Sequence, residues 1–355
     1  MSDTKIITTI GPSSLNAEVL SFFKQHSVEY ARLNFSHSGT DWHLEAGKRC
    51  RKAGLKLLVD LGGPKIRLGE LRSDTKIESG QKVVLEYLDQ ALNYPFDLET
   101  GETVLPVALD VVPVLAIDKI VLIDDGKLCL KVYKIEGARA FCTVEAGGIF
   151  KSRKGVNLPK SSFQTSFLTA RDKTMIRDTL ADLVPEVMAC SFVKTKKDVD
   201  EIKDFLKKVI LEKNIDSAYF PKICCKLEQN EVFMGENLTE IVQASDIVMI
   251  ARGDLALEVS PVHLSLPFLQ EKIKRVCENQ NKPFVIATQI LESMTSCPVP
   301  TRAEMSDLYR AVILDKADFI MLSGESAIGN YPTECVKLMN DMIAQSELMQ
   351  KEILG

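Results

Sequence analysis

Eight short apolar runs, each followed by a segment with amphipathic helical spacing, constrain the fold of this chain more than any other feature. The runs that predict strands are Lys5–Ile10, Tyr30–Leu33, Leu55–Asp60, Glu186–Cys190, Lys222–Cys225, Asp246–Ile250, Phe284–Ala287 and Phe319–Leu322. The segments that predict helices are Ala17–Gln25, Asp41–Lys52, Ala170–Leu180, Lys197–Glu212, Glu236–Gln243, Leu266–Asn279, Glu304–Leu314 and Pro332–Gln345. Near-continuous apolar strands that alternate with helices indicate a parallel sheet of the α/β class, and eight units predict a closed (β/α)8 TIM barrel. An open doubly wound sheet is the alternative, but no G-x-G-x-x-G follows the first strand.

One stretch interrupts this alternation. From about residue 69 to residue 156 the sequence becomes rich in strands and turns, and Asp125-Gly126 between two alternating apolar runs predicts a hairpin. We therefore expect a small all-β lid domain at residues 69–156, inserted into a barrel formed by residues 1–68 and 157–355. The segments LGGPKIRLG and GGIFKSRKGVNLP form its two junctions, and such glycine-rich junctions suit a hinged lid over an active site.

Composition excludes several classes of protein. The 355 residues include 44 basic and 49 acidic side chains, and the net charge of −5 gives no global basic field for nucleic acid. The start, MSDTKIITTI, lacks the features of a secretory signal, and no apolar stretch approaches the roughly 18 residues of a membrane span. The nine cysteines contain no C-x-x-C pair, which predicts core thiols in a reducing cytoplasm. We expect a cytoplasmic protein that binds neither nucleic acid nor membrane.

Polar and charged residues follow most of the predicted barrel strands, at the end of a barrel where active sites lie. These residues are Arg32, Asn34, Ser36, His37, Asp60, Arg67, Ser191, Lys194, Lys226, Glu228, Arg252, Asp254, Thr288, Gln289, Ser323 and Glu325. Solvation alone does not explain so many polar groups converging on one rim. Two carboxylates beside a lysine and an arginine favour a divalent metal and a phosphorylated substrate, because Mg²⁺ prefers carboxylate and phosphate oxygens.

Some of these residues have a structural alternative. The glycine before Asp254 would let a ligand approach the backbone, but Asp254 could instead cap a helix. Lys226 could be an ion-pair partner of Glu228 or Asp254. Glu228 could be a surface charge, although its spacing puts it on the same strand face as Lys226. His37 could only cap a turn.

The segments that carry these residues resemble pyruvate kinases from end to end. In family order they are TKIITTIGPSS, ARLNFSHSG, LLVDLGGPKIRLGE, LIDDGKLCLKV, GGIFKSRKGVNLP, CSFV, KLEQNEV, VMIARGDLALEV, ATQILESMTSCPVPTRAE and FIMLSGESAIGNYPTE. The resemblance implies a phosphotransferase that acts on phosphoenolpyruvate and ADP and yields pyruvate and ATP.

The resemblance also implies a role for each matching residue. Glu228 and Asp254 would bind Mg²⁺, for which Mn²⁺ could substitute. Lys226 would stabilise the phosphoryl group in transit, and Arg32 and Arg67 would contact phosphate oxygens. The substrate carboxylate would be held by Ala251, Arg252, Gly253, Asp254 and Thr288. The nucleotide would be lined by Pro12, Asn34, His37 and Lys154. A monovalent-cation site would be formed by Asn34, Ser36 and Asp60.

Two departures from the family pattern matter. After Asp60 the chain continues Leu-Gly-Gly-Pro-Lys, where potassium-dependent members have Thr-Lys-Gly-Pro-Glu, and Leu68 replaces a threonine. The lysine marks members that work without K⁺, so we expect the ammonium of Lys65 to substitute for the ion. The chain also ends at Gly355, where family members continue into a regulatory domain. We therefore expect no effector control through that domain, and a homodimer through the barrel instead of a tetramer.

Two alternative functions remain open at this stage. A regulatory paralogue would bind phosphoenolpyruvate or nucleotide without turnover. An aldolase or lyase of enolate chemistry would use Mg²⁺ and an α-keto acid but would have no need of ADP.

Overall fold

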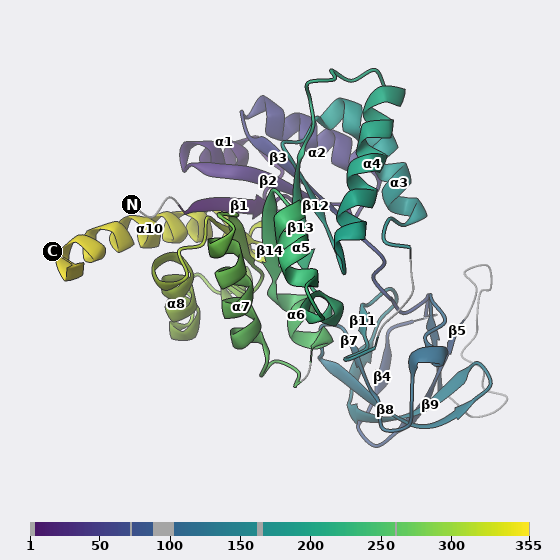
Figure 1. Cartoon of the computed structure of the whole chain (residues 1–355). Coiled ribbons are helices and arrows are strands. Elements are labelled where there is room, and N and C mark those ends of the chain that lie inside the picture. Colours follow the sequence, from purple (N-terminus) through teal and green to yellow (C-terminus); the bar gives the residue numbers. More distant parts are fainter. Residues whose placement is uncertain (1–3, 72, 88–102, 162–165, 260, 355) are drawn as a thin grey trace. The chain divides into compact units, whose positions relative to one another are not determined.

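The computed structural model describes residues 4–71, 73–87, 103–161, 166–259 and 261–354, with side chains described as far as residue 345 (Figure 1). The chain divides into two compact units. We call the first the barrel unit, formed by Met1–Gly63, Ser166–Gly253 and Pro267–Gly355. The second, formed by Pro64–Thr165 and Asp254–Leu266, is the β unit.

The barrel unit is built on eight parallel strands that close on themselves, as the alternating pattern predicts. The strands are β1 (Lys5–Thr9), β2 (Val28–Asn34), β3 (Lys56–Leu61), β12 (Val187–Cys190), β13 (Lys222–Leu227), β14 (Ile247–Ala251), β15 (Phe284–Ala287) and β16 (Phe319–Leu322). They pair in the order β1-β16-β15-β14-β13-β12-β3-β2. Strands buried on both faces explain the near-continuous apolar runs, and side chains such as Ile7, Leu58, Met249 and Met321 fill the barrel interior. The prediction of a TIM barrel is confirmed.

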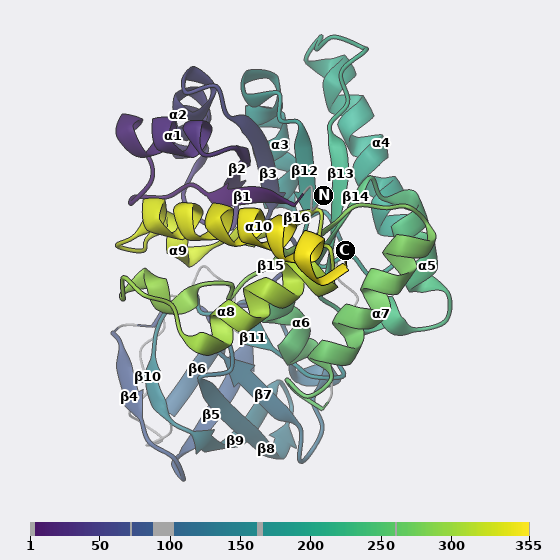
Figure 2. The same ribbon diagram turned by 90° about the vertical axis from the view of Figure 1, so that its left-hand side faces the viewer.

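Helices surround these strands (Figure 1). They are α1 (Ala17–Gln25), α2 (Thr40–Lys52), α3 (Ala170–Leu183), α4 (Lys196–Glu212), α5 (Asn237–Ala244), α7 (Leu266–Asn279), α8 (Arg302–Tyr309) and α10 (Pro332–Leu354). Figure 2 shows α10, in yellow, beside α1 and α8. Thr169 caps α3 and Thr301 caps α8, each through a capping box with the acidic residue three positions later.

Short helical segments also follow several strands. The α-helices α6 (Arg252–Glu258) and α9 (Gly324–Ala327) follow β14 and β16 and were not predicted. Both begin at or beside a glycine and are too short to display a helical apolar period. The 3-10 turns are η1 (Val112–Val114), η2 (Asn230–Phe233) and η3 (Glu292–Thr295), and the π-helical turn η4 (Arg310–Leu314) follows α8.

The β unit contains the predicted all-β insertion. Its six-stranded sheet has the order β11-β7-β8-β9-β5-β6, and β4 pairs with β10. The strands are β4 (Thr75–Ile77), β5 (Lys82–Tyr87), β6 (Thr103–Val107), β7 (Ile120–Ile123), β8 (Leu128–Glu136), β9 (Arg139–Ala146), β10 (Gly148–Phe150) and β11 (Val156–Asn157). The predicted hairpin joins β7 to β8, and its turn has positive φ at Asp124, Asp125 and Gly126. Part of the predicted insertion, residues 72 and 88–102, lies outside the described residues.

Within the described residues, no helix is both long and apolar enough to cross a membrane.

Candidate functional site

Three neighbouring strands bring an arginine and an aspartate together at the carboxyl end of the barrel. Asn34 on β2 is in register with Asp60 on β3. Arg32, two residues before Asn34, directs its Nη2 and Nε to Asp60 Oδ2 at 2.7 and 2.8 Å. Its Nη1 donates to Thr9 Oγ1 at the end of β1, at 2.8 Å. Three of the five guanidinium N–H donors of Arg32 are therefore engaged within the barrel unit.

Asp60 is held in its ionised form. The residue is fully buried, and burial acts to raise the pKa of its carboxyl. The charges of Lys226 and Arg32, and their hydrogen bonds, act in the opposite direction and prevail, so the pKa of Asp60 lies below its ordinary value. A buried carboxylate between two cations is a stable arrangement only while both partners remain.

Lys226 lies at the centre of this network. Its ammonium is 2.6 Å from Ser191 Oγ, 3.3 Å from Asp60 Oδ1 and 3.1 Å from Glu228 Oε1. The hydroxyl of Ser191 in turn lies 2.7 Å from the carbonyl oxygen of Leu61, to which it donates. The ion pair between Lys226 and Glu228, raised from the sequence as a structural alternative for Lys226, is present, and Ser191 fixes the ammonium from a third side.

Glu228, just beyond β13, is buried and is no surface charge. Its side chain is 2% exposed, and Oε2 accepts a hydrogen bond of 2.7 Å from the backbone N–H of Phe192. With Arg32 and Lys226 positive and Asp60 and Glu228 negative, the network is neutral as a whole. We call these four side chains, with Ser191, the strand-end network.

Four of the residues predicted to meet the nucleotide or the monovalent cation lie at or just after the ends of β1 and β2, namely Pro12, Asn34, Ser36 and His37. Asn34 Oδ1 accepts from the backbone N–H of Ser36 at 3.1 Å, and the N–H of His37 donates to the carbonyl oxygen of Asn34 at 3.2 Å. The carbonyl oxygen of His37 lies 2.8 Å from a ring nitrogen of His43. Pro12 and His37 are exposed. One hydrogen bond between backbone groups and two that involve the side chains of Asn34 and His43 therefore shape this turn.

Thr288, at the end of β15, lies in a strained turn beside the loop after β14. Thr288 and Gln289 both have positive φ, at 71° and 52°. Thr288 Oγ1 accepts from the backbone N–H of Gly253 at 3.0 Å. Arg252 supports the turn, since its Nη2 donates to the Thr288 carbonyl oxygen at 2.6 Å and its Nη1 lies 2.7 Å from Asp307. The side chain of Arg252 is thus engaged in positioning Thr288.

A second charged group lies inside the β unit. The ammonium of Lys65 is 2.8 and 2.9 Å from the two carboxylate oxygens of Asp254. Asn157 Nδ2 donates to Asp254 Oδ1 at 3.1 Å and to Glu258 Oε1 at 2.8 Å. Asp254 lies in the first turn of α6. We call the four residues the Asp254 cluster.

Two further predicted residues, Arg67 and Lys154, contact other parts of the β unit. Arg67 Nη1 donates to the carbonyl oxygen of Arg153 at 3.0 Å, and its backbone forms an isolated bridge with Gly155. Lys154 Nζ lies 2.7 Å from Asp124 Oδ1 in the β7–β8 turn. Both side chains are partly exposed.

The carboxylates of Glu228 and Asp254 have the donor chemistry that Mg²⁺ requires. Both offer hard oxygen donors in partly or fully buried surroundings. Across the described residues, no three His, Cys, Asp or Glu side chains gather into a metal site. Mg²⁺ is commonly held by one or two carboxylates together with substrate phosphates, so the residues present fit that ion.

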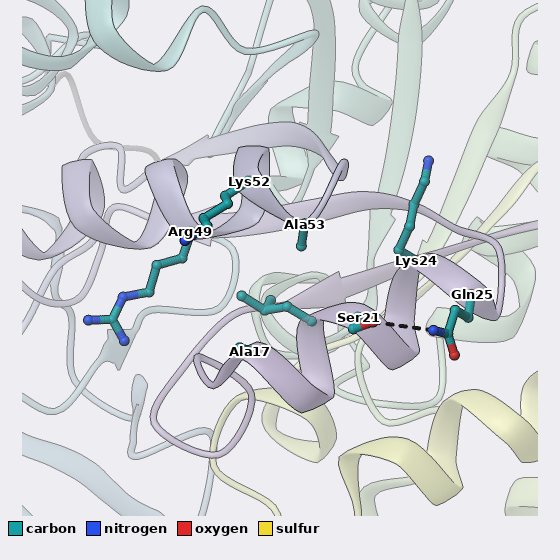
Figure 3. A pocket seen from close by; sticks show the side chains of 8 residues that line it. Ala17, Ser21, Lys24, Gln25, Arg49, Lys52 and Ala53 are labelled. Atoms are coloured by element: carbon teal, nitrogen blue, oxygen red, sulfur yellow. Dashed lines mark hydrogen bonds between the residues drawn. The ribbon is translucent and has the colours of Figure 1, made fainter.

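A cavity of about 640 Å³ lies elsewhere, beside α1 and α2 (Figure 3). Its lining consists of Ala17, Leu20, Ser21, Lys24, Gln25, Arg49, Lys52 and Ala53. None of the predicted site residues lies among them, so this cavity is separate from the predicted site.

Two residues in these groups were missed by sequence reasoning. Ser191 was noted at a strand end but given no role, because nothing in the sequence shows that it contacts Lys226. Asn157 was not singled out at all, since its partners Asp254 and Glu258 come 97 and 101 residues later. Its position in the second junction of the inserted domain was the only available signal.

The closed parallel barrel, with acidic and basic side chains joined at its strand ends, defines a TIM-barrel enzyme. The family profile described as "Pyruvate kinase, barrel domain" matches residues 1–336. The pyruvate kinase of Methylorubrum extorquens is 36% identical over 351 residues, covering 97% of this chain and 68% of that protein. The pyruvate kinase of Thermococcus litoralis is 35% identical over 360 residues, covering 99% of this chain and 71% of that protein. The chain belongs to the pyruvate kinase family, and is a phosphotransferase.

Proposed function

We propose that the chain transfers the phosphoryl group of phosphoenolpyruvate to ADP, with Mg²⁺ as cofactor and without a requirement for K⁺. Membership of the family supports the substrates and products. The observation that carries the residue assignment is the strand-end network, in which Lys226 is held at fixed distance from Ser191, Asp60 and Glu228.

In this proposal Glu228 and Asp254 hold the metal. When bound, Mg²⁺ supplies positive charge to the phosphate oxygens and thereby stabilises the anionic transition state. Mn²⁺ has similar ligand preferences and is expected to substitute.

Lys226 provides fixed positive charge along the path of the phosphoryl group. The bond between phosphorus and the enol oxygen of phosphoenolpyruvate breaks, and a bond forms to a β-phosphate oxygen of ADP. Because the transition state is loose and anionic, an ammonium already fixed in place stabilises it without reorganisation. Arg32 and Arg67 are proposed to contact phosphate oxygens. Asp60 and Ser191 position the ammonium of Lys226.

The carboxylate of the substrate is assigned to the loop after β14 and to Thr288. Backbone from Ala251 to Asp254 would hold it, with the hydroxyl of Thr288 near the enolate carbon that takes up a proton. The hydrogen bond from Gly253 N–H to Thr288 Oγ1 supports this, since it joins the two segments at 3.0 Å. Pro12, Asn34, His37 and Lys154 are assigned to the nucleotide.

Lys65 is the reason to propose activity without K⁺. Its ammonium already lies within 2.9 Å of Asp254, a proposed metal ligand, and brings a positive charge that a bound ion would otherwise supply. Wild-type turnover should be similar in Na⁺ and K⁺ buffers, whereas Lys65→Glu should be slow and recover when K⁺ is added. A collapse of wild-type turnover on omitting K⁺ would rule the proposal out.

Two wider expectations go with this function. The protein is proposed to act in the cytoplasm and to form a homodimer through the barrel. Sedimentation velocity tests the dimer.

A further inference from the structure

In the Asp254 cluster, the ammonium of Lys65 occupies the carboxylate oxygens that a bound metal ion would use. Both carboxylate oxygens of Asp254 face the ammonium of Lys65, at 2.8 and 2.9 Å, in a near-symmetrical contact. The side chains of Lys65 and Asp254 are 18% and 16% exposed. A divalent ion on Asp254 would need the same oxygens, so the ammonium and the metal compete for them.

The surroundings let Lys65 move while Asp254 stays in place. A lysine side chain is a flexible four-carbon stem with a compact charge, and the side chain of Lys65 is partly exposed to solvent. Its stem lies against Gly155, where an added Cβ would come within 2.8 Å of Lys65 Cε, so glycine leaves room for it. Asn157 is only 1% exposed and holds Asp254 and Glu258 on one amide nitrogen. Asp254 therefore keeps a partner when the ammonium leaves.

The charges of the cluster explain why a counter-ion is needed. Asp254 and Glu258 are four residues apart on α6, one helical turn, so two like charges lie on one face. Asn157 satisfies hydrogen bonds of both but carries no charge. In the absence of a metal, Lys65 offsets the charge of Asp254.

We propose that Lys65 is an exchangeable counter-ion of Asp254, which neutralises this carboxylate until a divalent ion replaces it. The inference rests on the proposed function, in that it takes Asp254 as a metal ligand. It follows that Lys65 weakens metal binding to the protein without substrate, and that removing its charge tightens that binding.

The test measures Mn²⁺ binding in the absence of substrate. The electron paramagnetic resonance signal of unbound Mn²⁺ reports how much of the ion remains free. Lys65→Met keeps the unbranched stem and removes the charge, and it should tighten Mn²⁺ binding about fivefold, the effect of removing an ion pair at the strong end of the range for exposed pairs. Lys65→Arg should remain close to wild type. Lys274→Met serves as the matched control, because Lys274 is 13% exposed and pairs with Asp315 in the barrel unit. It should leave Mn²⁺ affinity unchanged.

Asp254→Asn separates the inference from the function it rests on. If Asp254→Asn weakens Mn²⁺ binding but Lys65→Met does not tighten it, the counter-ion role is wrong and the proposed function stands. If Asp254→Asn leaves Mn²⁺ binding unchanged, the metal assignment itself fails. When it is combined with Asp254→Asn, Lys65→Met should no longer tighten Mn²⁺ binding, because the carboxylate for which the Lys65 ammonium and the metal compete is gone. Circular dichroism of each variant checks that the fold is retained.

Discussion

Replacing Lys226 by methionine removes the ammonium that joins Ser191, Asp60 and Glu228 in the strand-end network. The ammonium lies 3.1 Å from Glu228 and 3.3 Å from Asp60, and its side chain is 11% exposed. Without it the network changes from neutral to a net charge of −1, and Ser191 loses a donor. At about 3 Å and an effective dielectric constant of about 20, each lost contact is worth roughly 5 kcal/mol before desolvation is counted. Desolvation offsets much of this, which leaves a loss of about 3–5 kcal/mol in the free energy of unfolding.

The same substitution removes fixed positive charge from the proposed path of the phosphoryl group. We expect kcat to fall by about 10³–10⁵-fold, the range for a cation that stabilises a transferring phosphoryl group. Mn²⁺ binding should survive, since Glu228 and Asp254 remain. The assays are pyruvate formation at saturating substrates and urea unfolding monitored by circular dichroism. A variant that is destabilised but keeps kcat within tenfold of wild type would show that Lys226 is only a structural ion-pair partner. If the free energy of unfolding of Lys226→Met were unchanged, the balanced buried charges of the strand-end network would not be what stabilises it.

Three other predictions follow from the geometry. The pKa of Asp60 is lowered in the folded protein, so its ionised form stabilises the fold above the ordinary pKa of aspartate, and this contribution is lost as pH falls through the lower folded value. Asp60→Asn should therefore be less stable at neutral pH and show a smaller loss of stability on acidification. Equal pH slopes in urea unfolding would contradict this. Thr288→Val keeps the shape but removes the oxygen that accepts from Gly253, and should lower kcat by about tenfold or more, whereas Thr288→Ser should retain most activity. If Thr288→Val were fully active, the hydroxyl of Thr288 would have no role in catalysis. Burial raises the pKa of the Cys224 and Cys225 thiols, so a thiol reagent on the native protein should label the exposed Cys297 and spare both. Rapid labelling of Cys224, identified by mass spectrometry, would contradict this prediction and show that β13 opens to solvent.

Much of the fold could be predicted because it follows from patterns within short stretches of the sequence. The barrel strands are buried on both faces, so their apolar runs stand out, and β15 and β16 have the predicted bounds. The hairpin at Asp125-Gly126 follows from the positive φ that such residues tolerate. The helix α6 escaped prediction because its seven residues begin with a charged, glycine-containing sequence and lack an apolar period.

The site was predictable in its residue types but, apart from the ion pair between Lys226 and Glu228, not in its pairings. That Arg32, Asp60, Lys226 and Glu228 gather at strand ends follows from barrel topology. That they form one neutral network does not, because it depends on rotamers and on Ser191, whose role no local pattern indicates. Asn157 joins Asp254 and Glu258 across a long sequence separation, which a single sequence does not reveal.

The central claim is tested most directly by pyruvate formation from phosphoenolpyruvate and ADP, with Mg²⁺ and in buffer without K⁺. The account predicts steady turnover that depends on the metal, changes little when K⁺ is added, and is nearly abolished in Lys226→Met. Turnover that appears only with K⁺ would contradict the role given to Lys65. An absence of turnover with K⁺ present would contradict the proposed activity and favour a paralogue that binds substrate or nucleotide without converting it.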